Sequence, residues 1–207
     1  MSKNIILRPY QRSDRRHLEN IIRRTWQYDR FCSSKTAARL AAIYLESCRG
    51  NQTFMRVAEV GGVTKGVIMG KDCRGFKMSA ASRLKLTWEG LLLCSCREGR
   101  RIAGAYSGID QVDRELLKDS GRQFQGEVAF FAVDEKCRGL GIGKMLFGEL
   151  LSYMEARGIR RFYLFTDSSC NYGFYEHQGM RRCGKTCYEV PLGIKNEMEF
   201  YLYEYTV

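Results

Sequence analysis

The chain has 207 residues, of which 44% are hydrophobic and 12% aromatic, and it contains only two prolines. This composition is typical of one folded domain with a sizeable core, and it excludes a disordered chain. The sequence has no apolar run of about eighteen residues and no leader pattern, so membrane insertion and secretion are not indicated and a cytoplasmic protein is expected.

The nine cysteines are odd in number and scattered along the chain. The pairs Cys94/Cys96 and Cys183/Cys187 lack the Cys-x-x-Cys spacing of a zinc site. Reduced, mostly buried thiols are therefore expected, and no metal site is predicted.

The formal net charge of +11 is unevenly distributed: residues 1–100 carry +12 and residues 101–207 carry −1. A basic half favours an acidic substrate, nucleic acid or ribosomes, but it also simply aids solubility. Charge alone therefore does not choose among these classes.

The first seventy residues predict a strand, two helices and a hairpin. Asn4–Arg8 is a short strand, and the following helix, capped by Ser13 or Asp14, turns Leu18, Ile21 and Ile22 inward. An aromatic turn of Trp26, Tyr28 and Phe31 precedes the second helix, and core packing is one role open to it. The remaining elements are the helix Ser34–Cys48 and the strands Thr53–Val60 and Val63–Gly70, joined at Gly61-Gly62.

About fifty-five residues, 71–126, separate this hairpin from the next strand, which is too long for an unstructured loop. Apolar residues at helical spacing predict helices over Ser82–Cys96 and Gly108–Ser120, the second ended by Gly121. We interpret 71–126 as a helical insertion. A lid, a dimer surface and a decorative subdomain all remain open for it.

The second half predicts the central strand Glu127–Val133, a polar turn to Cys137, a glycine-rich bend and the helix Met145–Arg157, ended by Gly158. Arg161–Thr166 is a further strand. Ser168 or Ser169 is expected to cap a short helix, Asn171–Gln178, ended by Gly179. Two strands, Met180–Val190 and Met198–Tyr205, close the chain.

The bend from Arg138 to Lys144 lies between a strand and the start of a helix, where unpaired N–H groups and the helix dipole favour an anion. A Walker A loop is excluded because Arg138 and Met145 occupy its required glycine and hydroxyl positions. The dinucleotide fingerprint is excluded because the glycines fall at every second residue.

The bend does match Arg/Gln-x-x-Gly-x-Gly/Ala, through Arg138, Gly141 and Gly143. Downstream, residues 171–180 hold an Asn, then Phe-Tyr, then a glycine after the helix. These two motifs, in this order and with a strand between them, resemble the GNAT superfamily of N-acetyltransferases, as a bacterial-type member with a helical insertion before the central strand. The resemblance implies one α+β domain over 1–207, with helices flanking a mixed, mostly antiparallel sheet.

The resemblance also implies acetyl-CoA as the acyl donor. Backbone N–H groups across the bend would hold its pyrophosphate, the edge of the central strand would pair with the pantetheine, and two residues of the second motif would touch the CoA arm. The residues concerned are Arg138, Gly139, Leu140, Gly141, Ile142, Gly143 and Lys144 for the pyrophosphate, Phe131, Ala132 and Val133 for the pantetheine, and Asn171 and Phe174 for the arm. Core packing is an equal alternative for Phe174.

Transfer to an amine needs a base, because an amine of pKa near 10 is mostly protonated at pH 7, and it needs a proton or hydrogen bond for the departing thiolate. By its place in the resemblance, Glu127 is the candidate base, with a water chain as the alternative, and Tyr175 is the candidate acid. Glu176 and Asp167 are weaker candidates, and an N–H near Val133 would meet the oxyanion.

The sequence thus predicts direct transfer of an acetyl group to a primary amine, with no acyl-enzyme intermediate. The basic first half favours an acceptor with acidic groups around its amine. A catalytically silent CoA-binding domain and, less favoured, a nucleic-acid-binding protein are the alternatives, and a homodimer is left open.

Overall fold

The computed structural model describes residues 4–192 and 197–207. Within them, seven strands form one sheet in the order β1-β2-β3-β4-β5-β7-β6. Only β4 and β5 are parallel neighbours in this sheet; the other pairs are antiparallel, which confirms the predicted α+β class with a mixed, mostly antiparallel sheet. The strands are β1 (Ile5–Arg8), β2 (Phe54–Val60), β3 (Val63–Asp72), β4 (Gly126–Val133), β5 (Arg161–Asp167), β6 (Arg181–Tyr188) and β7 (Met198–Thr206).

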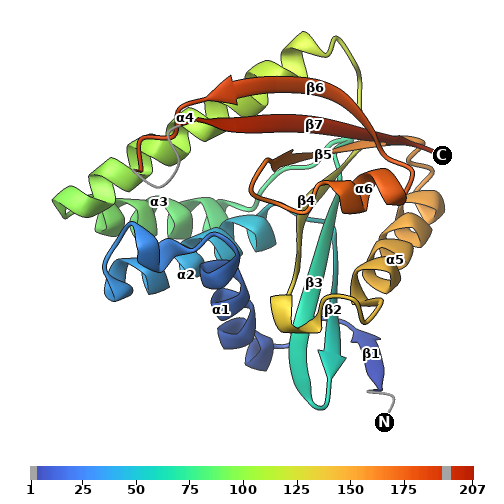
Figure 1. Cartoon of the computed structure of the whole chain (residues 1–207), viewed down its shortest axis with the longest axis horizontal. Helices are drawn as coiled ribbons and strands as arrows, with labels where there is room; N and C mark the ends of the chain where they lie inside the picture. The colour runs from blue at the N-terminus through green and yellow to red at the C-terminus, as the bar shows by residue number, and fades with distance from the viewer. Residues whose placement is uncertain (1–3, 193–196) are drawn as a thin grey trace.

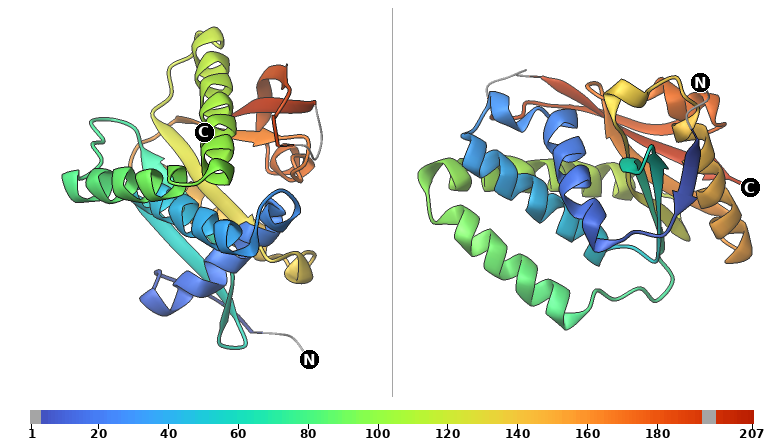
Figure 2. Two further views of the ribbon diagram at one scale, coloured as in Figure 1. Left: turned by 90° about the vertical axis from the view of Figure 1, so that its left-hand side faces the viewer. Right: turned by 90° about the horizontal axis from the view of Figure 1, so that it is seen from below.

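Helices cover both faces of the sheet (Figures 1 and 2). The helices are α1 (Arg15–Thr25), α2 (Ser34–Gly50), α3 (Ala80–Cys94), α4 (Arg97–Asp119), α5 (Ile142–Ala156) and α6 (Gly173–His177). One core joins α1, α2 and the start of α4 to β2, β3 and β4, and a second joins α5 to the opposite face. Within the described residues, no helix combines the length and hydrophobicity needed to cross a membrane.

The first half follows the sequence prediction closely. Leu18, Ile21 and Ile22 of α1 are buried, and Ser33 caps α2 through the N–H of Thr36. The hairpin turn at Gly61 and Gly62 has φ angles of 60° and 77°, which only glycine adopts at low cost.

Strand β4 carries a bulge that the sequence did not predict. Met69 pairs with Phe130 while Gly70 pairs with Val128, so Ala129 is an extra residue in β4. Because the extra residue reverses the alternation of side chains, Val128 packs on the α5 side and Phe130 on the side of α1 and α2.

The segment 71–126, interpreted from the sequence as an insertion, contains α3 and α4, and α4 begins eleven residues before the predicted Gly108. Glycines at 104 and 108 lower the helix propensity of this segment. Burial of Ile102 and Ala105 and the cap at Cys96, whose Sγ accepts from the Gly99 N–H, outweigh this effect. All nine cysteines lie in the described ranges and are unpaired.

Helix α4 connects the two halves of the sheet. Ile102 is fully buried in the core with α1 and α2, whereas Val112 and Leu116 pack in a third core with β5, β6 and β7. Figure 1 shows α4 running along β6, and Figure 2 shows α3 and α4 meeting at one end and pointing in different directions. Helix α3 instead exposes Leu84, Trp88 and Leu91, and the oligomeric state stays a prediction.

Two local predictions were wrong in detail. Helix α6 spans Gly173–His177 only, and Tyr172 precedes it without a side-chain cap. Neither predicted serine caps it: the Ser169 hydroxyl donates to Oδ1 of Asp167, and the Ser168 hydroxyl accepts from the Glu199 N–H at 3.3 Å. In the aromatic turn, Tyr28 is 1% exposed and belongs to the core.

The turn between α3 and α4 requires glycine at position 99, because a Cβ there would lie 1.8 Å from the carbonyl oxygen of Leu93. Gly99→Ala is expected to destabilise the fold by about 3 kcal/mol or more, since the backbone must move. Gly104→Ala in the same helix meets nothing within 4 Å and is expected to stabilise by about 0.5–1 kcal/mol. Thermal unfolding of both variants checks this, and equal melting temperatures would contradict it.

Candidate functional site

Strands β4 and β5 pair only at their first two positions, Gly126 with Phe162 and Glu127 with Tyr163. Beyond them the two strands separate, and the edge of β4 from Val128 to Val133 is left without a neighbour on this side. Because β4 keeps its pairing with β3 along its full length, the separation opens a slot in the middle of the sheet.

The glycine-rich loop lies at the far end of this slot and leads into α5. Gly139 and Gly141 have φ angles of 81° and 79°, and the first helical hydrogen bond runs from the Met145 N–H to the Gly141 carbonyl. In the part of the chain that the structure describes, the N–H groups from Gly139 to Lys144 donate to no other group, whereas the Arg138 N–H donates to Glu135. Six consecutive free donors at the start of a fifteen-residue helix are an arrangement that favours an anion.

Asp134 fixes the start of the loop and was not singled out from the sequence. Its buried carboxylate accepts from the Lys136 N–H at 3.1 Å and from Nζ of Lys65 at 3.1 Å. Burial would raise the pKa of Asp134, but these two donors lower it below its ordinary value. An apolar strand followed at once by an aspartate is the signal that identifies such a cap.

The open edge of β4 presents backbone groups to the slot. The Asp134 N–H donates to the Lys65 carbonyl of β3 at 2.7 Å. Because successive N–H groups of a strand point in opposite directions, the Val133 N–H points away from β3, toward the slot. The side chain of Ala132 is buried in the core, and those of Phe131 and Val133 pack on the α5 side.

Residues of the second motif line the same region. The ring of Phe174 packs against Phe131 and Phe147 at centroid distances of 5.4 and 6.2 Å, and a Cβ on Gly143 would lie 3.2 Å from it. Phe174 is therefore a packing residue that also holds the loop glycine at close range, and its contact with a cofactor stays a prediction. Asn171 is exposed in the turn before α6.

Tyr175 is half-buried beside the open edge of β4, with its ring 6.2 Å from that of Phe131 and 6.1 Å from that of Tyr203. Burial, with the nearby Cys170 and Asp167, raises the pKa of its hydroxyl well above 10. Among the described residues the hydroxyl has no recorded hydrogen-bond partner, so the phenol is neutral and its donor is free.

Glu127 lies at the closed end of the slot. Its Oε2 is 3.3 Å from Nζ of Lys71, and both side chains are less than a fifth exposed. The bulge places Glu127 and Phe131 on opposite faces of β4, and four residues of extended strand separate them by about 13 Å. Glu127 therefore lies on the α4 face of the sheet, away from Tyr175.

A second carboxylate on that face was missed by sequence reasoning. Burial raises the pKa of Asp113, in α4, to about 7, and repulsion from Asp110, Asp167 and Glu127 adds to the rise. Oδ1 of Asp113 has no hydrogen-bond partner within the described residues. Its place in α4, outside either motif, gave no sequence signal. Of the two weaker candidates, Glu176 is paired with Arg182, and Asp167 is held by Ser169.

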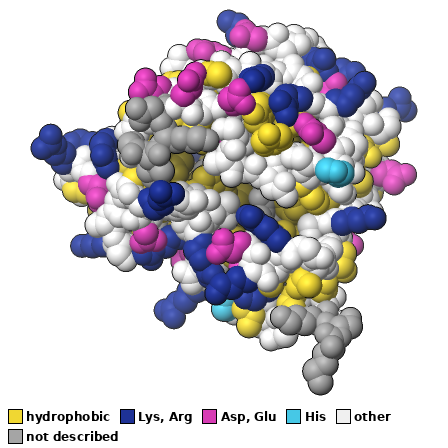
Figure 3. Space-filling model, viewed as in Figure 1, with side chains coloured by type: hydrophobic (Ala, Val, Ile, Leu, Met, Phe, Trp, Pro, Cys, Tyr) yellow, Lys and Arg dark blue, Asp and Glu magenta, His cyan; other side chains and the backbone are white. Residues whose placement is uncertain are grey.

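The space-filling view looks onto this region (Figure 3). Hydrophobic side chains gather near the middle of the face, where the surface is hollowed between the part built by β6 and β7 and the part built by α1 and α2. Leu140, within the loop, and Met145, just after it, are 43% and 40% exposed.

The slot, the glycine loop and the arrangement of the sheet define an acyltransferase fold of the GNAT kind, and comparison with known proteins agrees. The model of the acetyltransferase (GNAT) family matches residues 18–180. The chain therefore belongs to this family, as its two motifs predicted. A search of curated proteins finds no match.

Solved structures with similar folds span nearly the whole chain. A ribosomal-protein-alanine N-acetyltransferase from Brucella melitensis has a TM-score of 0.59 at 14% identity, covering 98% of this chain and 99% of its own. An N-acetyltransferase from Staphylococcus aureus Mu50 has a TM-score of 0.56 at 16% identity, covering 98% of both chains. A putative acetyltransferase from Salmonella typhimurium, solved with acetyl-CoA, has a TM-score of 0.55 at 13% identity, covering 98% of this chain and 94% of its own. At these identities the likeness is one of fold.

Asp134→Asn removes the charge that pairs with Lys65, and a loss of about 1–3 kcal/mol of stability at pH 7 is expected. Because the folded pKa is lowered, the stabilisation is present above the unfolded pKa near 4 and is lost as pH falls below it. The difference in free energy of unfolding between the wild type and the variant should therefore disappear between about pH 5 and pH 2. Denaturant unfolding across this range measures it, with the exposed neighbour Glu135→Gln as control; a constant difference would contradict the assignment.

Proposed function

We propose that this protein transfers the acetyl group of acetyl-CoA directly to a primary amine. The observation that supports this most is the unpaired edge of β4 lying next to six free N–H donors at the start of α5. A pantetheine arm would complete the strand edge, and a pyrophosphate would accept from the loop.

In this proposal the loop from Gly139 to Lys144 contacts the pyrophosphate through its backbone, and the exposed Arg138 adds a guanidinium at its rim. Phe131, Ala132 and Val133 hold the pantetheine, and Asn171 and Phe174 border the CoA arm. The Val133 N–H, which points into the slot, stabilises the oxyanion that forms on the thioester carbonyl.

The chemistry is an attack of the amine nitrogen on the thioester carbon. The C–N bond forms, the C–S bond breaks, the nitrogen loses one proton and the sulfur gains one. At pH 7 only about one amine in 1,000 is unprotonated, so a proton acceptor is required.

Tyr175 serves the leaving sulfur. Because its pKa is raised above 10 while a thiol has a pKa near 8.5, complete proton transfer from phenol to free thiolate is unfavourable. Tyr175 therefore acts chiefly as a hydrogen-bond donor to the sulfur while the C–S bond breaks, and the released thiolate then takes its proton from water. Glu127 accepts the amine proton through water, since it lies on the opposite face of β4 and is paired with Lys71.

Gly141→Asp places a Cβ and a negative charge at a left-handed position of the loop, and it should abolish measurable acetyl-CoA binding by calorimetry. Gly75→Asp is the matched control, because Gly75 has a φ of 72° and open space around it but lies between β3 and α3. Equal binding by both variants, or no binding by the wild type, would reject the cofactor site.

Tyr175→Phe should lower kcat by about 10²-fold or more without weakening acetyl-CoA binding, since only the hydroxyl is lost.

Glu127→Gln should lower kcat/KM, and Asp113→Asn tests the carboxylate whose pKa is raised to about 7. If Asp113 were the base, kcat/KM would rise with pH through about 7 in the wild type and in Glu127→Gln, but not in Asp113→Asn. Binding of acetyl-CoA without turnover on any amine would favour a silent CoA-binding domain.

A further inference from the structure

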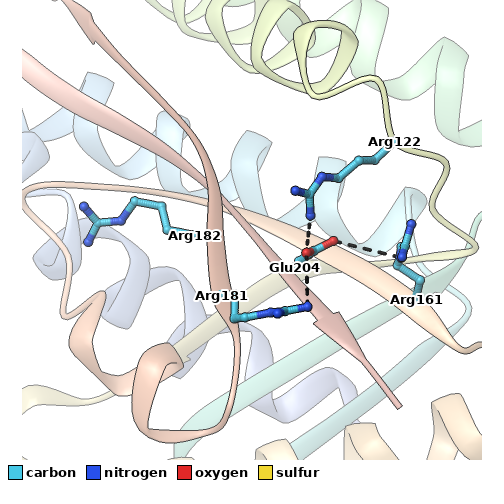
Figure 4. A pocket seen from close by; sticks show the side chains of 5 residues that line it. All are labelled: Arg122, Arg161, Arg181, Arg182 and Glu204. Carbon is cyan, nitrogen blue, oxygen red and sulfur yellow. Dashed lines mark ion pairs between the residues drawn. The ribbon is translucent and has the colours of Figure 1, made fainter.

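A pocket of about 410 Å³ lies away from the slot and is lined by Arg122, Arg161, Arg181, Arg182 and Glu204 (Figure 4). Glu204 is 4% exposed and pairs with Arg122; Nη2 of Arg181 is 3.8 Å from its Oε1 and Nε of Arg161 is 4.0 Å from its Oε2. Figure 4 shows these three arginines pointing toward Glu204, while Arg182 points to the other side of β6.

This pocket is at the opposite end of the sheet from the glycine loop. Because β4 and β5 run parallel and start together, Arg161 lies level with Gly126, whereas the loop follows Val133 at the other end of β4. The pocket is therefore separate from the proposed acetyl-CoA site.

The arginines continue along this end of the sheet as a row. Backbone hydrogen bonds link Cys73 to Gln125 at 2.8 Å and Gln125 to Arg161 at 2.9 Å, so the ends of β3, β4 and β5 lie side by side. At the β3 end, the buried Asp72 pairs with Arg74 at 2.8 Å and with Arg157 at 3.1 Å. We call the six residues Arg74, Arg122, Arg157, Arg160, Arg161 and Arg181 the arginine row.

The row carries more positive charge than its partners neutralise. All six side chains are exposed, and only two buried carboxylates, Asp72 and Glu204, pair with them in the structure as described. An excess of four positive charges remains. Each buried carboxylate pairs with its arginines from the protein side. The guanidinium N–H groups that are not used in these ion pairs remain accessible to solvent.

We propose that the arginine row binds the phosphate backbone of nucleic acid without sequence preference. The row crosses five strands, from β3 to β6, which is about 20 Å at the spacing of strands in a sheet. An extended polyanion fits this length and the two separate pairing centres better than a single anion does. Duplex nucleic acid presents the densest charge, about one per 1.7 Å, and the net charge of +11 draws it in. Guanidinium groups bind phosphate oxygens through paired N–H donors, so the proposed contacts are to phosphates.

The test is fluorescence anisotropy with a labelled 20-base-pair duplex of mixed sequence, titrated at several salt concentrations. The double variant Arg160→Glu with Arg181→Glu should weaken binding roughly 50-fold at 0.1 M salt and lower the salt slope by about 1.8, as expected for two lost phosphate contacts. The matched control, Arg12→Glu with Arg16→Glu, changes the net charge equally at exposed positions outside the row and should weaken binding less than about threefold.

Equal weakening by the two double variants would overturn the proposal, because only net charge would then matter. Displacement of the duplex by millimolar inorganic phosphate would also overturn it in favour of a single-anion site, and tighter binding of polyglutamate would do so in favour of an acidic polypeptide. Should the double variant fail to fold, Arg160→Glu alone, which removes no observed side-chain ion pair, is expected to lower the salt slope by about 0.9.

Discussion

The hydrogen-bonding between β4 and β5 stops after two residue pairs, and the rest of the molecule depends on this interruption. A strand edge inside a sheet cannot be buried without partners, because each unpaired N–H or carbonyl costs about 1–3 kcal/mol. The edge of β4 must therefore face water or a ligand that supplies matching groups. A slot of this kind is a requirement of the backbone before any side chain is considered.

The bulge at Ala129 then decides which side chains meet at the slot. Without it, Glu127 and Phe131 would project from the same face of β4. With it, the carboxylate lies on the face covered by α4, and the aromatic ring lies with Tyr175 and Phe174 on the other. One additional residue thus separates the acidic and the aromatic parts of the candidate site.

Much of this arrangement could be predicted from the sequence because the signals are local. The apolar strand, the alternating glycines and the helix after them are close together in the chain, and with the second motif at 171–180 their order indicated the family. The bulge could not be predicted, since alanine carries no signal for it. The first part of α4 was missed because Gly104 and Gly108 lower helix propensity, while its buried contacts with α1, α2 and β6 come from distant segments. The arginine row joins five such segments, and no local pattern marks it. The catalytic and cofactor roles remain predictions from the family motif.

Helix α4 has a mechanical consequence for the slot. It packs with α1 and α2 at one end and with β5, β6 and β7 at the other, while α5 spans both halves of the sheet on the opposite face. The two halves of the sheet are thereby held together by α4 on one face and by α5 on the other. A hinge motion between the halves would have to disrupt the hydrophobic cores under both helices. The width of the slot is consequently set by the fold itself. A ligand that enters it meets a preformed surface, so little of its binding energy is spent on ordering the protein.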